Sequence, residues 1–162
     1  IINNLTSDRT SRQAVVNIWR ESPPKTKDVP CTLNVQWLVR GVFIHTIVNM
    51  RSSDAWLGWP YDVFNFTMLT GYLMLHMAAQ GLPNLSLGTL TLNAGSQHLY
   101  EDNEQDAMKC LGHGTGQAFE YDEFKPYEFQ TPDNLVQHLW SLADRDGCTI
   151  FKWAEQMTMV ER

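Results

Sequence analysis

Two strand-like runs that meet at a glycine constrain the fold of this chain more than any other feature. Apolar and polar residues alternate from Cys31 to Leu38, Arg40-Gly41 interrupts the pattern, and a second apolar run extends from Val42 to Met50. Two such runs around a short break predict an antiparallel hairpin. Side chains alternate between the faces of a strand. The second run should therefore place Thr46, Val48 and Met50 on one face, and Ile47 and Asn49 on the other.

A long apolar segment follows the hairpin and has helical spacing from Tyr61 to Ala79. We expect Asp62 in the first turn of this helix and Gly81-Leu82-Pro83 at its end. The residues of its predicted buried stripe are Phe64, Met68, Leu69, Tyr72, Leu75, His76 and Ala79.

The remaining segments add strands and one further helix. Strands are predicted over residues 12–19, 85–92 and 126–129, with a bend over 94–96 and a glycine-containing loop from Cys110 to Gly116. Pro132-Asp133 should cap a helix from Asn134 to about Ala143. Strands outnumber helices, so the sequence predicts an α+β fold in which helices cover a sheet, and residues 1–162 form a single domain.

Composition limits the functional classes. The chain has 162 residues, of which 43% are hydrophobic and 19% are charged, and this argues against disorder. No apolar run is long enough for a membrane span. The net charge of −6 argues against a nucleic-acid-binding module. Three widely spaced cysteines do not form a disulfide framework or a metal site, so we expect a reducing, cytoplasmic setting and no metal.

Several polar residues could carry chemistry, and each has a structural alternative. Cys31 could be a thiolate nucleophile if Arg51 or Arg12 lies nearby, or a small core residue. Arg51 and Ser52 could bind a phosphate, or simply end a strand. His98 and Tyr100 could donate to a sugar hydroxyl, or pack. The glycines of 112–116 lack the lysine of a phosphate-binding loop and are interpreted as an ordinary loop.

Four motifs in one order resemble the thymidylate synthase family. The resemblance covers residues 5–103, and the motifs are Pro30-Cys31, Met50-Arg51-Ser52-Ser53-Asp54, Leu57-Gly58-Trp59-Pro60-Tyr61-Asp62 and Gly95-Ser96-Gln97-His98-Leu99-Tyr100. It implies a thymidylate synthase-like fold, with a mixed sheet covered by helices and a homodimer that forms through the sheet. It also leads us to expect that an N-terminal part of the family fold is missing.

The resemblance also implies a role for each matched residue. Cys31 would attack C6 of a pyrimidine nucleotide, and Arg51 and Ser52 would bind its 5′-phosphate. Arg12 would reach the phosphate in the partner's site, with Gln13 where the family usually has a second arginine. His98 and Tyr100 would hold the sugar 3′-hydroxyl. Asp54 and Gly58 would lie near the folate.

Two departures resemble the deoxycytidylate hydroxymethylase branch of that family. Asp62 stands where thymidylate synthases have Asn, and Thr32 follows the nucleophile where they usually have His. The string from Val48 to Ser52 also resembles that branch. A carboxylate can accept a hydrogen bond from the N4 amino group of cytosine, and a carboxyl that shares a proton can stabilise the charge that reaches N3 when Cys31 adds to C6.

The expected activity is therefore transfer of a hydroxymethyl group from 5,10-methylenetetrahydrofolate to C5 of dCMP, with Cys31 and Asp62 as catalytic residues. The resemblance implies a virus that modifies its DNA cytosines as the source, in which case the host cytoplasm is the setting. Other reactions of the family stay open, namely hydroxymethylation of CMP or methylation of dCMP or dUMP. A non-catalytic fragment that binds nucleotide or dimerises is the alternative from another class.

Overall fold

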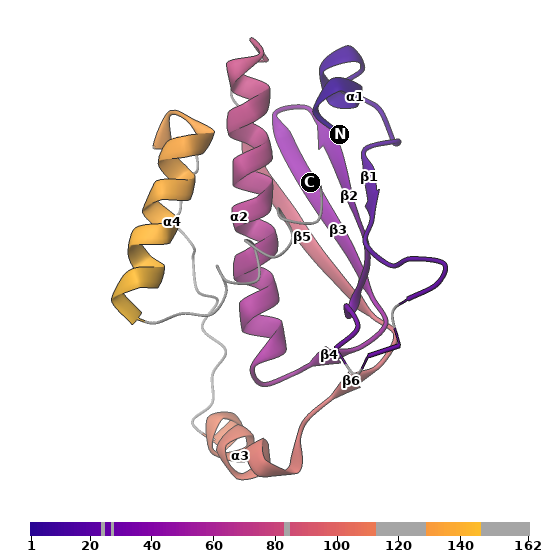
Figure 1. Ribbon diagram of the computed structural model, residues 1–162, viewed down its shortest axis with the longest axis vertical. Coiled ribbons are helices and arrows are strands. Elements are labelled where there is room, and N and C mark those ends of the chain that lie inside the picture. Colours follow the sequence, from indigo (N-terminus) through magenta and orange to yellow (C-terminus); the bar gives the residue numbers. More distant parts are fainter. Residues whose placement is uncertain (24, 27, 83–84, 113–128, 147–162) are drawn as a thin grey trace.

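The computed structural model describes residues 1–162 except 24, 27, 83–84, 113–128 and 147–162, and the side chains of 142–146 are also not described. The helices lie on one side of one central sheet or toward its ends (Figure 1). The elements in chain order are α1 (Ile2–Ser7), β1 (Val15–Asn17), β2 (Thr32–Arg40), β3 (Phe43–Met50), β4 (Ser53–Asp54), α2 (Gly58–Ala79), β5 (Ser86–Ala94), β6 (Gln97–His98), a 3₁₀ turn (Glu101–Asn103), α3 (Glu104–Gly112) and α4 (Pro132–Asp146).

The central sheet is mixed, as the resemblance implied. Its strand order is β1-β2-β3-β5, with antiparallel pairs from β1 to β3 and a parallel pair between β3 and β5. The predicted hairpin is confirmed, because β2 pairs with β3 across a turn in which Gly41 has φ of +60°. A side chain is disfavoured in this left-handed conformation, which explains the glycine. The α+β class is also confirmed.

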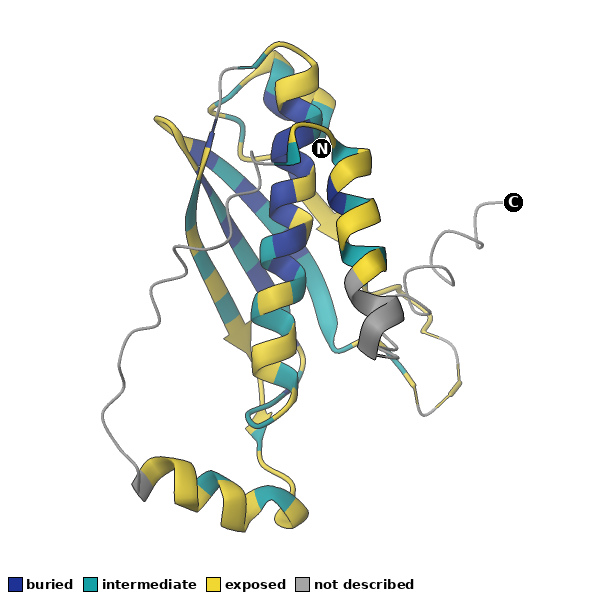
Figure 2. Cartoon of the chain, turned by 90° about the vertical axis from the view of Figure 1, so that its left-hand side faces the viewer, coloured by how far each residue is buried: buried dark blue, intermediate teal, exposed yellow. Residues whose placement is uncertain are grey.

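One face of the sheet packs against α2. Thr46, Val48 and Met50 of β3 share one face as predicted, and they are buried on the side of the sheet that meets the helix. The core between sheet and helices contains buried residues from α1, the strands and α2: Leu5, Ala14, Val35, Trp37, Val39, Ile44, Val48, Met50, Phe66, Leu73, Met74, Met77 and Leu85. Figure 2 shows these buried residues gathered in the strands and in α2, whereas α3 is exposed along most of its length.

The predicted stripe of α2 is wrong in large part. Met68 and Leu75 are buried, but against α4 through Leu135. Phe64, Leu69 and Tyr72 are exposed, because the face that meets the sheet is a different one. Apolar residues occur on all sides of this helix, so their spacing does not reveal which side is covered.

Several boundaries also differ from the prediction. The strand over 12–19 is limited to Val15–Asn17, and the strand after α2 runs from Ser86 to Ala94. Cys110–Gly112 belongs to α3 and not to a loop, because the helix continues from its acidic first turn. The rest of the predicted loop, 113–116, and residues 126–128 of the predicted strand lie outside the described residues.

The last described helix confirms one prediction and corrects another. α4 spans Pro132–Asp146 and so includes the predicted helix. Its cap is Thr131 and not Pro132-Asp133, because the Thr131 hydroxyl accepts a hydrogen bond from the Asn134 amide at 3.2 Å. Pro132 then occupies the first helical position, where a missing amide hydrogen has no cost. None of the described helices is long and apolar enough to cross a membrane.

Candidate active site

The ends of three strands bring most of the predicted site residues together. The Arg51 amide donates to the Cys31 carbonyl at 2.8 Å, which joins the start of β2 to the end of β3. The Gly95 amide donates to the Met50 carbonyl at 2.9 Å, which adds the end of β5. Cys31, Arg51 and the Gly95–Tyr100 segment therefore lie at one end of the sheet.

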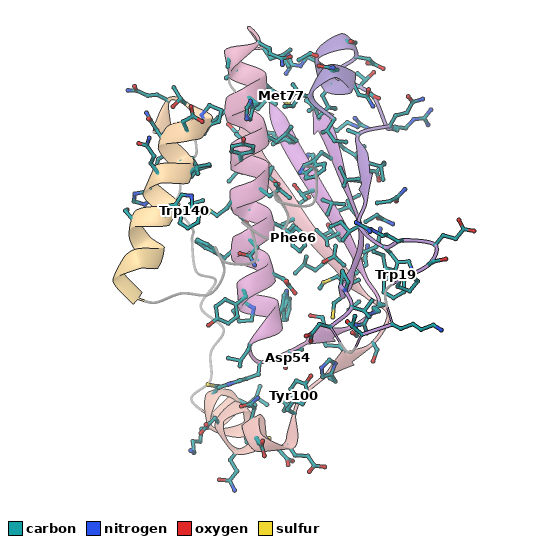
Figure 3. The ribbon with its side chains drawn as sticks, viewed as in Figure 1. Trp19, Asp54, Phe66, Met77, Tyr100 and Trp140 are labelled. Atoms are coloured by element: carbon teal, nitrogen blue, oxygen red, sulfur yellow. The ribbon has the colours of Figure 1, made fainter. Side chains whose placement is uncertain are left out.

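A two-stranded ladder continues this end of the molecule. β4 pairs with β6 in parallel, so that Asp54 lies opposite His98. The His98 and Tyr100 rings pack edge to face with their centroids 5.0 Å apart. Figure 3 shows Asp54 and Tyr100 at the same lower end of the molecule, where α2 begins.

Cys31 and Arg51 are linked through one hydroxyl. Cys31 Sγ lies 3.5 Å from Ser52 Oγ, and Arg51 Nη1 donates to the same oxygen at 3.2 Å. Cys31 is half-buried. A thiolate nucleophile needs positive charge nearby, and the guanidinium supplies it from one hydroxyl away. Cys31 also packs against the main hydrophobic core, so its alternative role as a small core residue stays open.

Arg51 also holds the backbone that precedes the cysteine. Its Nε donates to the Pro30 carbonyl at 3.2 Å, and its Nη2 donates to the Val29 carbonyl at 2.9 Å. The sequence contains no signal for these two contacts, because backbone carbonyls are available on any residue. Arg51 therefore fixes the approach to Cys31 in addition to its predicted role toward a phosphate.

Asp54 fixes the start of α2. Its carboxylate accepts hydrogen bonds from the amides of Trp56, Leu57 and Gly58 at 3.1, 3.0 and 3.2 Å. The Trp56 amide, the strongest influence, together with the other amides and the nearby His98, lowers the pKa of Asp54 below its usual value.

Gly58 allows a close approach to Asp54, since a Cβ there would lie 3.1 Å from the Cβ of Asp54. Three of the roughly four acceptor positions of the carboxylate are occupied by these amides, so about one is left for a ligand.

Asp62 differs from the prediction in its place on the helix. α2 begins at Gly58 and its first turn has no acidic residue, so Asp62 falls in the second turn. The helix begins earlier than its apolar spacing indicated, because Asp54 supplies acceptors for its first amides. Asp62 is half-buried, and this burial raises its pKa to about 6. Stabilisation by the helix dipole, the alternative interpretation of Asp62, weakens beyond the first turn.

The structure keeps Arg12 away from this cluster, and among the described residues no hydrogen bond, ion pair or ring contact joins Asp62 to it. Its carbonyl accepts a hydrogen bond from Gln36 Nε2 at 2.9 Å, five residues along β2 from Cys31. Five strand residues span about 16 Å, so Arg12 does not meet the Cys31 cluster of its own chain. Trp19, which the sequence placed only in a strand, lies over Arg51 with 5.9 Å between the guanidinium carbon and the ring centroid.

Comparisons with known proteins show which family this chain resembles. The family model described as thymidylate synthase matches residues 1–120. Thymidylate synthase from Buchnera aphidicola is 30% identical over 112 residues, which are 68% of this chain and 40% of that protein. Thymidylate synthase from Bacillus phage phi3T is 29% identical over 101 residues, which are 62% of this chain and 34% of that protein.

A solved structure shows the same fold. Thermostable thymidylate synthase A from Bacillus subtilis superposes with a TM-score of 0.55 at 24% identity, over 68% of this chain and 38% of that one. The chain thus spans about two fifths of the length of such relatives. The match over most of the chain shows that the protein belongs to the thymidylate synthase family.

Proposed function

We propose that this chain takes part in one-carbon transfer to C5 of a pyrimidine nucleoside monophosphate, with dCMP as the preferred substrate and 5-hydroxymethyl-dCMP as the product. The observation that carries this proposal is the contact series from Arg51 through Ser52 to Cys31, at 3.2 and 3.5 Å. It combines a cation and a hydroxyl suited to a phosphate with a sulfur nucleophile.

The reaction begins with the thiolate of Cys31. It adds to C6 of the pyrimidine, and the electron pair of the C5–C6 double bond makes C5 nucleophilic. C5 then takes the methylene group of 5,10-methylenetetrahydrofolate. Removal of the C5 proton by a base and loss of tetrahydrofolate leave an exocyclic methylene. Water adds to this methylene carbon and gives up a proton, while the electron pair returns to the C5–C6 bond and Cys31 departs as a thiolate. Hydride addition in place of water would give a methyl group.

Other predicted residues would hold the nucleotide. His98 and Tyr100 lie together beside β4, which suits donation to the sugar 3′-hydroxyl. Asp54 and Gly58 form the turn that precedes α2, where the folate is expected. Arg12 would serve the phosphate of the partner's site in a homodimer.

Asp62 supports cytosine as the base. A carboxylate can accept a hydrogen bond from N4, and a carboxyl with a pKa of about 6 can share a proton with N3 as negative charge reaches that atom. Uracil offers an acceptor at O4, which would leave the carboxylate facing another acceptor. An unmatched polar group in a closed site costs about 1–3 kcal/mol, enough to set the base preference.

Methylation of dUMP is the second candidate, because the relatives compared above carry the name thymidylate synthase. Product masses distinguish the two when dCMP, dUMP and CMP are each incubated with methylenetetrahydrofolate and the longest available form of the protein. The proposal expects dCMP to gain the elements of CH₂O. Gain of CH₂ by dUMP alone would establish the second candidate instead.

Exchange of the acid for its amide tests the role of Asp62. Asp62→Asn should shift the preference from dCMP toward dUMP by at least about tenfold, because the amide can donate to O4 and accept from N3–H. The ratio of kcat/KM for the two nucleotides measures this shift, with Asp133→Asn on α4 as the matched control. An unchanged ratio would remove Asp62 from base selection.

A further inference from the structure

The ring of Trp19, which lies over Arg51, takes no part in the proposed reaction. Trp19 lies just beyond the end of β1, and its ring centroid is 5.9 Å from the guanidinium carbon of Arg51. We propose that Trp19 is a positioning residue that holds Arg51 ready for the phosphate group of the nucleotide. This inference rests on the proposed function, and it adds a residue to the recognition of the phosphate.

The hydrogen bonds of Arg51 leave part of its guanidinium free to bind an anion. A guanidinium has five N–H donors, and three of those of Arg51 reach Pro30, Val29 and Ser52. Among the described residues, no other acceptor is recorded for its last two donors, one on each Nη. These remaining N–H groups are donors that phosphate oxygens can accept from. The side chain is exposed, so a group that lies against its face adds to these three hydrogen bonds in fixing its orientation.

Trp19 is itself held in place by β2. Its amide donates to the Leu33 carbonyl at 3.0 Å, and the amide of Ile18 donates to the same carbonyl at 2.9 Å. Leu33 comes two residues after Cys31, so the ring, the guanidinium and the sulfur are all fixed to the start of one strand. The indole attracts the cation electrostatically and reduces the rotamer freedom that Arg51 would lose on binding an anion.

The contact predicts a selective effect on phosphate binding. Trp19→Leu should weaken binding of dCMP and of inorganic phosphate by about two- to fivefold, as expected for an exposed cation–π contact. Binding of deoxycytidine, which has no phosphate, should not change. Trp19→Phe keeps an aromatic face and should recover much of the loss. Trp140→Leu is the matched control, because Trp140 lies on α4, across α2 from Trp19 (Figure 3).

Titration calorimetry measures these affinities, and the nitrogen NMR signal of Arg51 Nε reports the stacking without any ligand. Loss of affinity for dCMP and phosphate alone, with a shift of the Nε signal, establishes the inference. Equal weakening for deoxycytidine, or no weakening for phosphate, would overturn it. If the wild-type protein binds phosphate but neither nucleotide nor nucleoside, the proposed function is wrong. The phosphate affinities of the two Trp19 variants would still decide the role of Trp19.

Discussion

Two aspartates on either side of the start of α2 have pKa values shifted in opposite directions. Hydrogen bonds from three backbone amides, that of Trp56 foremost, lower the pKa of Asp54. Burial raises the pKa of Asp62 to about 6, and no opposing influence is recorded among the described residues. One carboxyl therefore stays ionised and holds the backbone, whereas the other can exchange a proton near neutral pH.

The raised pKa of Asp62 predicts how stability changes with pH. The unfolded chain has the ordinary Asp value of 3.8, so ionisation between pH 3.8 and about 6 favours the unfolded state. The stabilisation present below pH 3.8 should be lost as the pH rises to about 6. Asp62→Asn should lack this decline. Urea unfolding of both proteins from pH 3.5 to 7 measures it, and parallel pH profiles would contradict the burial of this carboxyl.

The candidate site could be predicted from sequence where a residue type is distinctive. Cys31, Arg51 and Ser52 stand in short motifs, and the structure brings them together. The support for Arg51 from Val29, Pro30 and Trp19 was not predictable, because it depends on carbonyl groups and on a strand pairing that places the indole.

The strands are easier to predict from the sequence than the buried face of α2. The sequence of β3 predicted which of its residues share a face, because successive side chains of a strand point to opposite sides of the sheet. α2 carries apolar residues on all sides, including the exposed Phe64, Leu69 and Tyr72, so periodicity alone did not indicate which side meets the sheet. Only the position of β2 and β3 decides that Phe66 and Met77 are covered.

A buried hydroxyl connects α2 to the sheet. Thr70 Oγ1 accepts a hydrogen bond from Trp37 Nε1 at 3.1 Å, donates to the Phe66 carbonyl at 2.7 Å and lies 2.7 Å from Thr46 Oγ1. All of these groups are inside the core, where an unpaired donor cannot reach water. The contact fixes the position of the helix along the strands.

Thr70→Val should therefore destabilise the fold by about 1–3 kcal/mol, although the two side chains have nearly equal size. The change leaves the indole N–H of Trp37 and the hydroxyl of Thr46 without their partner. Thr67→Val, on the same helix at a half-buried position, is the control for β-branching and should cost less than about 0.5 kcal/mol. Urea unfolding compares them, and equal losses would show that the network adds no stability.

At the scale of the whole molecule, the two faces of the sheet differ. Both apolar clusters of the described residues lie on the side of α2. The other face carries half-buried and exposed polar residues, among them an asparagine series in which Asn49 Nδ2 donates to Asn34 and Asn93 Nδ2 donates to Asn49, at 2.8 and 3.0 Å. A homodimer through this face is the arrangement that we expect, with Arg12 acting in the partner's site.

Mixing of two inactive variants tests this arrangement. Arg12→Ala and Cys31→Ser should each lose activity, and a refolded equimolar mixture should regain about one quarter of the wild-type activity, because each mixed dimer has one intact site. Sedimentation of each variant verifies that dimers form. A mixture no more active than its components would show that Arg12 does not act across the interface.

In the proposed reaction, Cys31 adds to C6 of a pyrimidine nucleotide whose base Asp62 selects. Addition makes C5 basic, so the C5 hydrogen of dCMP should exchange with solvent even without folate. Mass spectrometry of dCMP and dUMP incubated with the chain in heavy water measures this step alone. We predict that dCMP takes up deuterium faster than dUMP, and that neither takes it up with the Cys31→Ser variant. Uptake that persists with Cys31→Ser would show that Cys31 is not the nucleophile.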